Sequence, residues 1–506
     1  MRGLAIILLL LPLAASATTI AVNTNADNTN GGDGHCTLRE AIANVNAAGE
    51  TTGGDCPPGS GSGDTIVFSA SYAIRLTLGE LQIQQDVSIV GPPAALQLGG
   101  AHRTRVFEIV AGTTSMSDVT IRDGKADRGA GILVDSGATL SMTNCTIGGN
   151  TATVNGGGLF NNGGTVTLST CTFNGNQARP GNGGGLYNGA GSAALTNCIF
   201  TANVAHPGNG GAIDNEATAM LTNCTFKRNH ARVSSGGALE NGGMAMVTGC
   251  TFSLNKAAVR GGGIDSGGTL TISNSTLSGN TASVAGGGIE NGGTSTLTNS
   301  TISGNDARLF VVGVDGGGGG MDNNGTASLT NCTLTGNHAA RDGGGINNHG
   351  TITAHPTIEF TNCTLFGNKA PRGGGGGVAG PATYSNTIVA NNIAKFGANC
   401  DGESGGFDSG HNLVSTGNNT CLSTDGTDLL DTNPMLAPLG TYGGPTQTLA
   451  LCTGIALPHP SCTGPSPAID AGDDAVTGPP DNLATDQRGL PRLSGAHVDI
   501  GAYEVQ

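Results

Sequence analysis

The 506-residue sequence has few aromatic and few charged residues. Phe, Tyr and Trp make up 3% of it, with no Trp at all, and Asp, Glu, Lys and Arg make up 11%. The 36 acidic residues outnumber the 21 Lys and Arg residues, which gives a net charge of −15 at pH 7. Nucleic-acid binding usually needs a basic surface and aromatic side chains on which bases stack. The composition therefore argues against a nucleic-acid partner.

Long apolar runs are also missing, except at the N-terminus. Arg2 precedes an apolar run over Ile6–Leu13, and the small residues Ala15–Ala17 follow. This order is typical of a secretory signal peptide. We predict a signal peptide over residues 1–17 and a mature chain that begins at Thr18 and is secreted or held at the cell surface. No later stretch approaches the roughly 18 apolar residues of a membrane-spanning helix, so we expect no transmembrane helix.

Glycine, in contrast, is abundant, and much of it belongs to an internal repeat. The chain has 89 Gly residues, and copies of the segment Ser273–Asn280 recur about every 26 residues over half of the sequence. A Gly-Gly-x-Ile or Gly-Gly-x-Leu block, such as Gly261–Ile264, precedes most copies. Between the glycines, apolar and polar residues alternate in short runs such as Thr165–Leu168, which indicates strands and not helices.

This repeat predicts an all-β fold, a right-handed parallel β-helix solenoid with about 26 residues per coil. Stacked coils pair each strand with its equivalents about 4.8 Å above and below. The open end of a solenoid exposes strand edges, and Thr37 and Glu40 have the capping-box spacing of a helix that could cover it. We predict an N-terminal helical cap over residues 18–63, the β-helix over 64–396 and an irregular C-terminal cap over 397–506.

The 13 cysteines divide into two groups. Seven occupy one column of the repeat, where successive Cβ atoms lie farther apart than a disulfide allows, so we expect a buried and reduced ladder: Cys145, Cys171, Cys198, Cys224, Cys250, Cys332 and Cys363. The other six lie outside the repeats, and an exported protein can hold disulfides. Their proximity in sequence suggests the pairs Cys36–Cys56, Cys400–Cys421 and Cys452–Cys462.

Three sets of motifs resemble known families of exported proteins. Cys36–Ala41, followed by Asp64–Phe68, resembles the N-terminal segment of bacterial secreted proteins named for their CSLREA motif, with Thr37 in place of Ser. The repeats, with Gly210–Ile213 and Phe226–Asn229, resemble the GGAI and FxxN pairs of polymorphic outer-membrane proteins, a family of surface adhesins. Segments near the C-terminus are similar to the choice-of-anchor Q domain: Asn433–Pro434, Gly443–Thr448, Ser466–Gly472, Asp486–Gly489 and Asp499–Glu504. The resemblance implies an adhesin-like protein at the cell surface or outer membrane.

One outward column of the repeat is acidic. The residue after each Gly-Gly-x-Ile block alternates to the outside of the coil, and this column reads Phe160, Tyr187, Asp214, Glu240, Asp265, Glu290, Asp322 and Asn347. Carboxylates stacked one rung apart repel each other. Three interpretations stay open: a solvated polar face, a stripe that binds calcium as the one cofactor considered, or a catalytic site of a glycoside hydrolase or a calcium-dependent polyuronate lyase.

Nothing in this column singles out a catalytic residue, because repeat symmetry gives every carboxyl a similar environment. The ten His residues fall at different repeat phases and never pair at the spacing of transition-metal ligands, so we assign no such metal site. Two columns of Asn, one of them starting at Asn161 and the other at Asn150, are predicted to form structural hydrogen-bonded ladders. Charged residues near the C-terminus are predicted to hold a cap through an ion pair of Arg488 with a carboxylate: Asp470, Asp486, Asp499 and Glu504.

The longest insertions between repeats are the remaining candidates for function. One of them carries the apolar residues Leu309, Phe310, Val311 and Val312, and insertions in solenoids form loops that can contact a partner. We expect an exported β-helix with a binding, adhesive or structural role, and not primarily an enzyme, with a glycan or a surface protein as partner. The alternative is a polysaccharide lyase or glycoside hydrolase that acts on the outer face of the helix.

Overall fold

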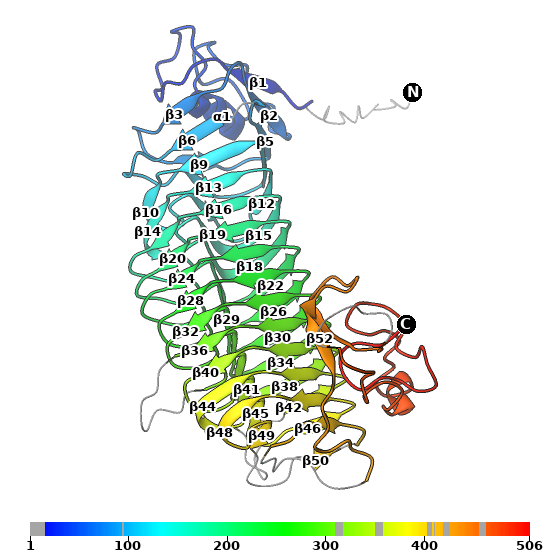
Figure 1. Cartoon of the computed structure of the whole chain (residues 1–506). Coiled ribbons are helices and arrows are strands. Elements are labelled where there is room, and N and C mark those ends of the chain that lie inside the picture. Colours follow the sequence, from blue (N-terminus) through cyan, green and yellow to red (C-terminus); the bar gives the residue numbers. More distant parts are fainter. Residues whose placement is uncertain are drawn as a thin grey trace, which may run out of the picture.

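The predicted fold class is confirmed. The computed structural model describes residues 16–93, 96–308, 317–349, 358–401, 407–408, 410–417, 426–454 and 462–506. They form a right-handed parallel β-helix with about 26 residues per turn, seen as an elongated stack of rungs in Figure 1. Each strand pairs in parallel with the equivalent strands of neighbouring turns, as Leu186 does with Leu159 and Ile213.

Three parallel sheets build the solenoid. Sheet A has 26 strands in two columns. The strands that follow the glycine turns form its first column: β4 (Leu81–Ile83), β7 (Phe107–Ile109), β11 (Ile132–Val134), β15 (Leu159–Ser169), β18 (Leu186–Thr196), β21 (Ile213–Asn215), β25 (Leu239–Asn241), β29 (Ile264–Ser266), β33 (Ile289–Asn291), β37 (Met321–Asn323), β41 (Ile346–Asn348), β45 (Val378–Ala379) and β49 (Cys400–Asp401). β15 and β18 continue into the second column, whose other strands are β1 (Thr19–Val22), β2 (Asp64–Phe68), β5 (Val87–Val90), β8 (Thr113–Ser117), β12 (Thr139–Thr143), β22 (Thr218–Thr222), β26 (Met244–Thr248), β30 (Thr269–Ser273), β34 (Thr294–Thr298), β38 (Thr326–Thr330), β42 (Ile358–Thr361), β46 (Thr383–Ser385) and β50 (Phe407–Asp408).

Sheets B and C close the remaining sides of each turn. Sheet B has 14 strands: β3 (Ala73–Arg75), β6 (Leu96–Gly99), β9 (Val119–Arg122), β13 (Thr146–Gly148), β16 (Thr172–Asn174), β19 (Ile199–Thr201), β23 (Thr225–Lys227), β27 (Thr251–Ser253), β31 (Thr276–Ser278), β35 (Thr301–Ser303), β39 (Thr333–Thr335), β43 (Thr364–Phe366), β47 (Ile388–Ala390) and β51 (Leu413–Val414). Sheet C has 11 strands: β10 (Lys125–Arg128), β14 (Thr151–Asn155), β17 (Gln177–Ala178), β20 (Val204–Ala205), β24 (His230–Ala231), β28 (Lys256–Ala257), β32 (Thr281–Ala282), β36 (Asp306–Ala307), β40 (His338–Ala339), β44 (Lys369–Gly374) and β48 (Ile393–Phe396).

The core lies inside the coil and is built of stacked identical positions. In β12, Leu140 and Met142 are buried while the alternate residues face outward, as the two-residue period of a strand requires. Four Phe rings of sheet B stack at centroid distances of 4.5, 5.1 and 4.6 Å: Phe173, Phe200, Phe226 and Phe252. Parallel register makes such ladders possible, because each side chain meets its own equivalent one rung away.

Polar ladders occupy the corners of the coil, as predicted. The amide of Asn229 donates to Phe200 O at 2.9 Å and to Asn255 Oδ1 at 3.0 Å, and its own Oδ1 accepts the backbone N–H of Asn203 at 3.0 Å. The same contacts repeat along the ladder that starts at Asn150, and a second ladder that starts at Asn161 bonds amide to amide. All seven column cysteines are buried and free, so the predicted thiol ladder is confirmed.

The N-terminal helix and two of the three predicted disulfides are present. α1 (Leu38–Ala47) begins with the predicted capping box of Thr37 and Glu40. The bonds Cys36–Cys56 and Cys452–Cys462 are formed, whereas Cys421 lies outside the described residues and its pairing stays a prediction. No helix among the described residues is long and apolar enough to cross a membrane. The proposed signal peptide lies almost entirely outside them.

The C-terminal segment does more than close the end of the solenoid. Leu429 bridges Leu413 on the last rung of sheet B, but the chain then runs back along the side of earlier rungs (Figure 1). Outward Thr side chains of sheet B receive it: Thr333 Oγ1 lies 2.6 Å from Gln487 Oε1, and Thr364 Oγ1 accepts the N–H of Ala502 at 3.0 Å. The segment contains β52 (Leu436–Gly440) paired antiparallel with β53 (Thr448–Leu451), and the 3-10 helix η1 (Asp474–Thr477).

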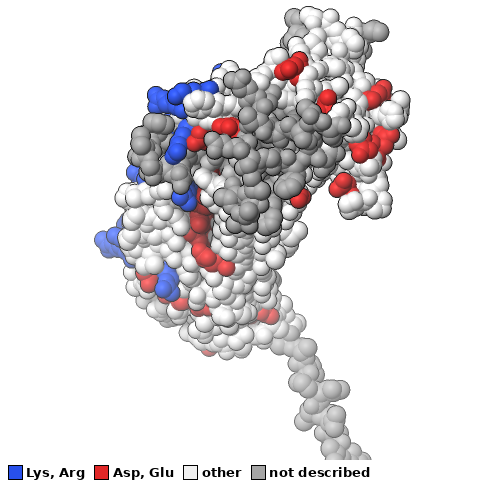
Figure 2. Space-filling view, turned by 90° about the horizontal axis from the view of Figure 1, so that it is seen from below, with Lys and Arg blue, Asp and Glu red and all other residues white. Residues whose placement is uncertain are grey.

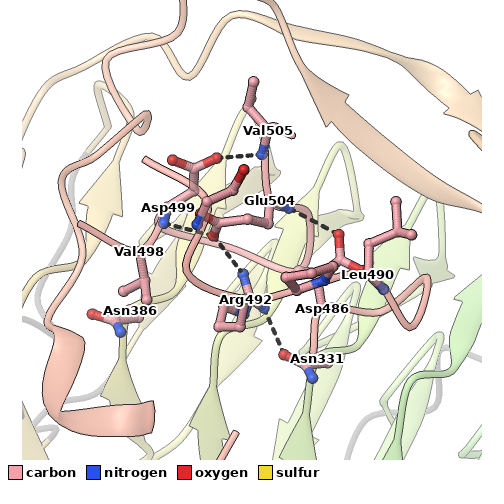
Figure 3. Close-up of polar contacts among 12 residues, drawn as sticks. Asn331, Asn386, Asp486, Leu490, Arg492, Val498, Asp499, Glu504 and Val505 are labelled. Carbon is pink, nitrogen blue, oxygen red and sulfur yellow. Dashed lines mark hydrogen bonds and ion pairs between the residues drawn. The ribbon is translucent and has the colours of Figure 1, made fainter. Parts of the chain in front are cut away.

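Buried ion pairs hold this segment together. Arg488 Nη2 lies 2.6 Å from Asp486 Oδ2, which confirms the predicted pairing of Arg488 with a carboxylate. Arg492, which the sequence analysis did not single out, is fully buried between the solenoid and the segment (Figure 3). It donates to Asn331 Oδ1 at 2.6 Å and lies 3.6 Å from Glu504 Oε2. These charges attach the segment to the side of sheets A and B.

Candidate functional site

The first column of sheet A brings all five predicted acidic residues together. They are the middle residues of five successive strands, and parallel register places each beside the next. We call Asp214, Glu240, Asp265, Glu290 and Asp322 the carboxyl column. Figure 2 shows Asp and Glu atoms as a narrow band on this face, with Lys and Arg atoms along one edge of it.

The expectation of a solvated polar face is wrong for most of this column. The exposed fraction is 0% for Asp214, 3% for Glu290 and 1% for Asp322, and the other two side chains are half-buried. The glycine turns explain this burial. Gly261 has φ +60°, and a Cβ atom on it would lie 2.7 Å from the Cβ of Asp265. Because the turns pack directly against the column, each carboxyl is enclosed by its own turn and by the rungs on either side.

At the C-terminal end of the column, around Glu290 and Asp322, neighbouring side chains form hydrogen bonds with the carboxyls. Asn347 donates to Asp322 Oδ1 at 2.8 Å, and His349 Nε2 lies 2.9 Å from the same oxygen. Asn324 donates to Glu290 Oε1 at 2.9 Å, and no described residue bonds Glu290 Oε2. Burial, and then the nearby charge of Asp322, raise the pKa of Glu290 to about 9.

Arg260 interacts with two neighbouring carboxyls of the column, Glu290 and Asp265. Its Nη1 lies 3.5 Å from Glu290 Oε1, and its charge also acts on Asp265. Burial raises the pKa of Asp265, while Ser235 and Arg260 act in the opposite direction. These carboxyls are therefore partly compensated by fixed donors of the protein.

Asp214 differs from the others because no described residue donates a hydrogen bond to either of its oxygens, and its side-chain neighbour within hydrogen-bond reach is the carboxyl of Glu216. Burial, followed by the repulsion of Glu216, raises the pKa of Asp214 to about 8. Glu240 has one unpartnered oxygen, and burial together with Asp265 and Asp214 raises its pKa to about 9. An uncompensated buried carboxyl is costly, so burial favours the protonated form of both groups.

The residue that directly follows each Asn of the ladder starting at Asn161 can donate a hydrogen bond to a carboxyl of the column. Asn324 and His349 occupy this position in the C-terminal rungs, and each reaches the carboxyl one rung earlier. In the rung after Asp214 the same position is Gly242, which has no side chain to donate. Glu216 occupies it in Asp214's own rung, and its Oε2 would lie 2.4 Å from a Cβ on Gly242. Sequence analysis missed Glu216, although comparing this column along the repeats would have revealed it.

An aromatic pair continues the column toward the N-terminus. Phe160 and Tyr187 stack with ring centroids 5.0 Å apart at an interplanar angle of 13°, and Arg128 lies 5.6 Å over the Phe160 ring. Tyr187 is half-exposed and pairs in register with Asp214. The site thus joins a stacked aromatic surface to a group of protonated carboxyls, although aromatic residues are scarce in the chain as a whole.

Two other predictions stay without a structural test. No group of three or more His, Cys, Asp or Glu side chains that could hold a metal ion occurs in the described part of the chain, and calcium binding by the column stays a prediction. The apolar loop Leu309–Val312 lies outside the described residues.

Comparison with known proteins agrees with the fold. A family model described as a right handed beta helix region matches residues 102–257 and 159–334. No curated protein matches the chain. The crystal structure of pectate lyase Pel9A is similar over 97% of this chain and 98% of that chain, with 14% identity and a TM-score of 0.29. The Dettilon tailspike protein (gp208) is similar over 81% of this chain and 68% of that chain, with 11% identity and a TM-score of 0.27. The matched family model and the observed architecture agree on the right-handed parallel β-helix fold.

Proposed function

We propose that this protein is an exported β-helix that binds a polysaccharide at the aromatic pair and the adjoining carboxyls. The observation that carries the proposal is Asp214, a fully buried carboxyl to which no described residue donates a hydrogen bond, next to the half-exposed Tyr187 and Glu240. Binding sites combine an apolar surface with a few convergent polar groups. Here Tyr187, Glu216 and Glu240 form the accessible part of the site and Asp214 its floor.

The chemistry of these groups favours an uncharged sugar. A protonated carboxyl donates one hydrogen bond and an ionised one only accepts, and a sugar hydroxyl can satisfy both. An anionic sugar at Asp214 would meet the charge of Glu216, while the charge of Arg260 acts on Glu290 and Asp265 and Arg128 lies over the Phe160 ring at the far end of the site. Export is supported by two disulfides, which persist in oxidising compartments, and by the predicted signal peptide.

The test is affinity electrophoresis of the chain from Thr18 onward in gels that contain neutral polysaccharides, followed by calorimetry on any polymer that retards it. We expect Tyr187→Ala and Asp214→Asn to weaken binding at least tenfold. Asp322→Asn is the matched control, because Asp322 belongs to the same column but already has partners, and it should bind normally. If all three variants bind as the unchanged protein does, the ligand does not occupy this site.

A second candidate function, glycoside hydrolysis, is favoured by the unequal carboxyl environments. Retaining glycosidases use two carboxyl groups about 5 Å apart, one protonated and one ionised, and adjacent rungs lie at about that spacing. Protonated Glu240 would be the acid. The same samples should be examined for shortened chains, with calcium and with chelator. Cleavage that Glu240→Gln abolishes while binding persists would establish the enzyme, and loss of binding in chelator would establish the calcium stripe.

A further inference from the structure

Charges between residues 151 and 305 are separated onto different edges of the solenoid. This stretch contains five acidic residues, and they are four members of the carboxyl column and Glu216 in the adjoining turn. None of its six basic residues belongs to the carboxyl column, although Arg260 lies beside it, and we call the six the cationic edge: Arg179, Lys227, Arg228, Arg232, Lys256 and Arg260. The stretch has a net charge of +1 (six minus five), whereas the whole chain has −15.

Three members of the cationic edge, Arg179, Arg232 and Lys256, follow sheet C along the solenoid axis. Arg179 and Arg232 directly follow β17 and β24, at equivalent positions two rungs apart: their backbone N–H groups donate to Ala152 O and Ala205 O. Lys256 pairs in register with His230, one rung after it. Since rungs repeat about every 4.8 Å, these side chains form a line of positive charge.

Most of this edge is exposed and uncompensated. Arg179, Arg228, Arg232 and Lys256 are exposed, and among described residues only Arg260 of the edge forms an ion pair with an acidic side chain. Burial and the neighbouring charges of Arg232 and Lys256 lower the pKa of His230, as expected where cations are packed without counter-ions. The repulsion along this line would be relieved by an anionic partner.

We propose that the cationic edge binds an acidic polysaccharide that runs along the solenoid axis, with its carboxylate or sulfate groups beside successive rungs. A linear polyanion fits because the positive charges themselves form a line and not a compact pocket. Nucleic acid fits less well, since none of the exposed residues of this edge is aromatic and bases would find no stacking partner. This site is separate from the carboxyl column, which we propose to bind an uncharged sugar.

The test compares two polymers with the same backbone, dextran sulfate and dextran, by affinity electrophoresis of the chain from Thr18 onward. We expect dextran sulfate and alginate to retard the protein, with an affinity that falls as salt rises. Dextran should not bind at the cationic edge. The triple variant R179Q/R232Q/K256Q should bind dextran sulfate roughly tenfold to hundredfold more weakly, because three exposed charge pairs with the polymer, each weakened by water and salt, are lost.

The control removes the same charge elsewhere. The variant R75Q/R103Q/R122Q takes three exposed cations from the N-terminal rungs, none of them on a strand of sheet C, and should bind within about twofold of the unchanged protein. Equal loss in the two triple variants, or stronger binding to duplex DNA or to anionic phospholipid vesicles than to dextran sulfate, would overturn the proposal. Circular dichroism and thermal unfolding check that both variants fold. Asp214→Asn should leave this binding unchanged, so failure of the two proposals can be told apart.

Discussion

Replacing Asp214 by Asn tests the central feature of the site with little change of shape. The substitution removes an ionisable group that is fully buried and to which no described residue donates a hydrogen bond. Asn cannot ionise, so the variant keeps the neutral state that the buried position favours at every pH. The expected result is a protein whose stability exceeds that of the unchanged chain by a growing amount as pH rises from about 4 to about 8.

The sign and size follow from the pKa of this carboxyl. Burial raises the pKa of Asp214 from 3.8 to about 8. Between these two pH values the folded state keeps a proton that the unfolded state has lost, so the free energy of unfolding decreases as pH rises. Over the whole range this loss is at most about 6 kcal/mol. Below pH 4 the carboxyl is protonated in both states, and the variant and the unchanged protein should be equally stable.

Urea unfolding at pH 4, 7 and 9, followed by far-ultraviolet circular dichroism, measures the effect. Because solenoids can unfold in parts, difference infrared spectroscopy should confirm a protonated carboxyl at pH 7 that is missing in the variant. Asp322→Asn is the control: Asp322 accepts hydrogen bonds in the folded state, so its loss should not give the alkaline gain. Parallel stability curves for Asp214→Asn and the unchanged protein would refute the reasoning.

Three further predictions concern the scaffold. Gly210→Ala should lower the melting temperature clearly more than Gly304→Ala: both glycines have positive φ, but only at Gly210 would the new Cβ lie 2.2 Å from a carbonyl oxygen, whereas Gly304 has open space. Asn229→Ala should cost about 1–3 kcal/mol for each buried backbone group left unpaired, measured by thermal unfolding. Arg492→Ala should detach the C-terminal segment, because it leaves Glu504 buried without its counter-ion; limited proteolysis should then cut within residues 426–506 while the solenoid resists.

The sequence was sufficient for the fold because the repeat encodes it locally. Strict alternation along each strand decides which residue enters the core, and parallel stacking makes every rung repeat that decision. Ile213 is buried in the core and Asp214 belongs to the outward column for this reason. The Asn and Cys ladders could be predicted in the same way, since a residue that recurs at one phase must meet its own equivalent.

The candidate site could be predicted only in part, because burial depends on what surrounds each outward residue. The sequence placed Asp214 in the right column but could not show that the glycine turns enclose it. The path of the C-terminal segment depends on contacts such as that of Thr333 with Gln487, 154 positions apart, which no local pattern reveals. The net charge of the chain also gave no indication of the cationic edge, because the acidic residues outnumber the basic ones but lie elsewhere on the molecule.

Asp214 and Glu290 differ in the residue at one equivalent position of the following rung. For Glu290 this residue is Asn324, which donates a hydrogen bond to it, whereas for Asp214 it is Gly242, which has no side chain. Gly242 does not have positive φ, and a Cβ on it would meet only the flexible end of Glu216, so Gly242→Asn should be tolerated. The new amide should donate to Asp214, lower its pKa and flatten the pH dependence of stability while keeping the carboxyl. If the site binds sugar through the unpaired oxygens of Asp214, this variant should also bind it more weakly. Unchanged pH dependence in a folded Gly242→Asn protein would mean that burial alone, and not the missing donor, sets the behaviour of Asp214.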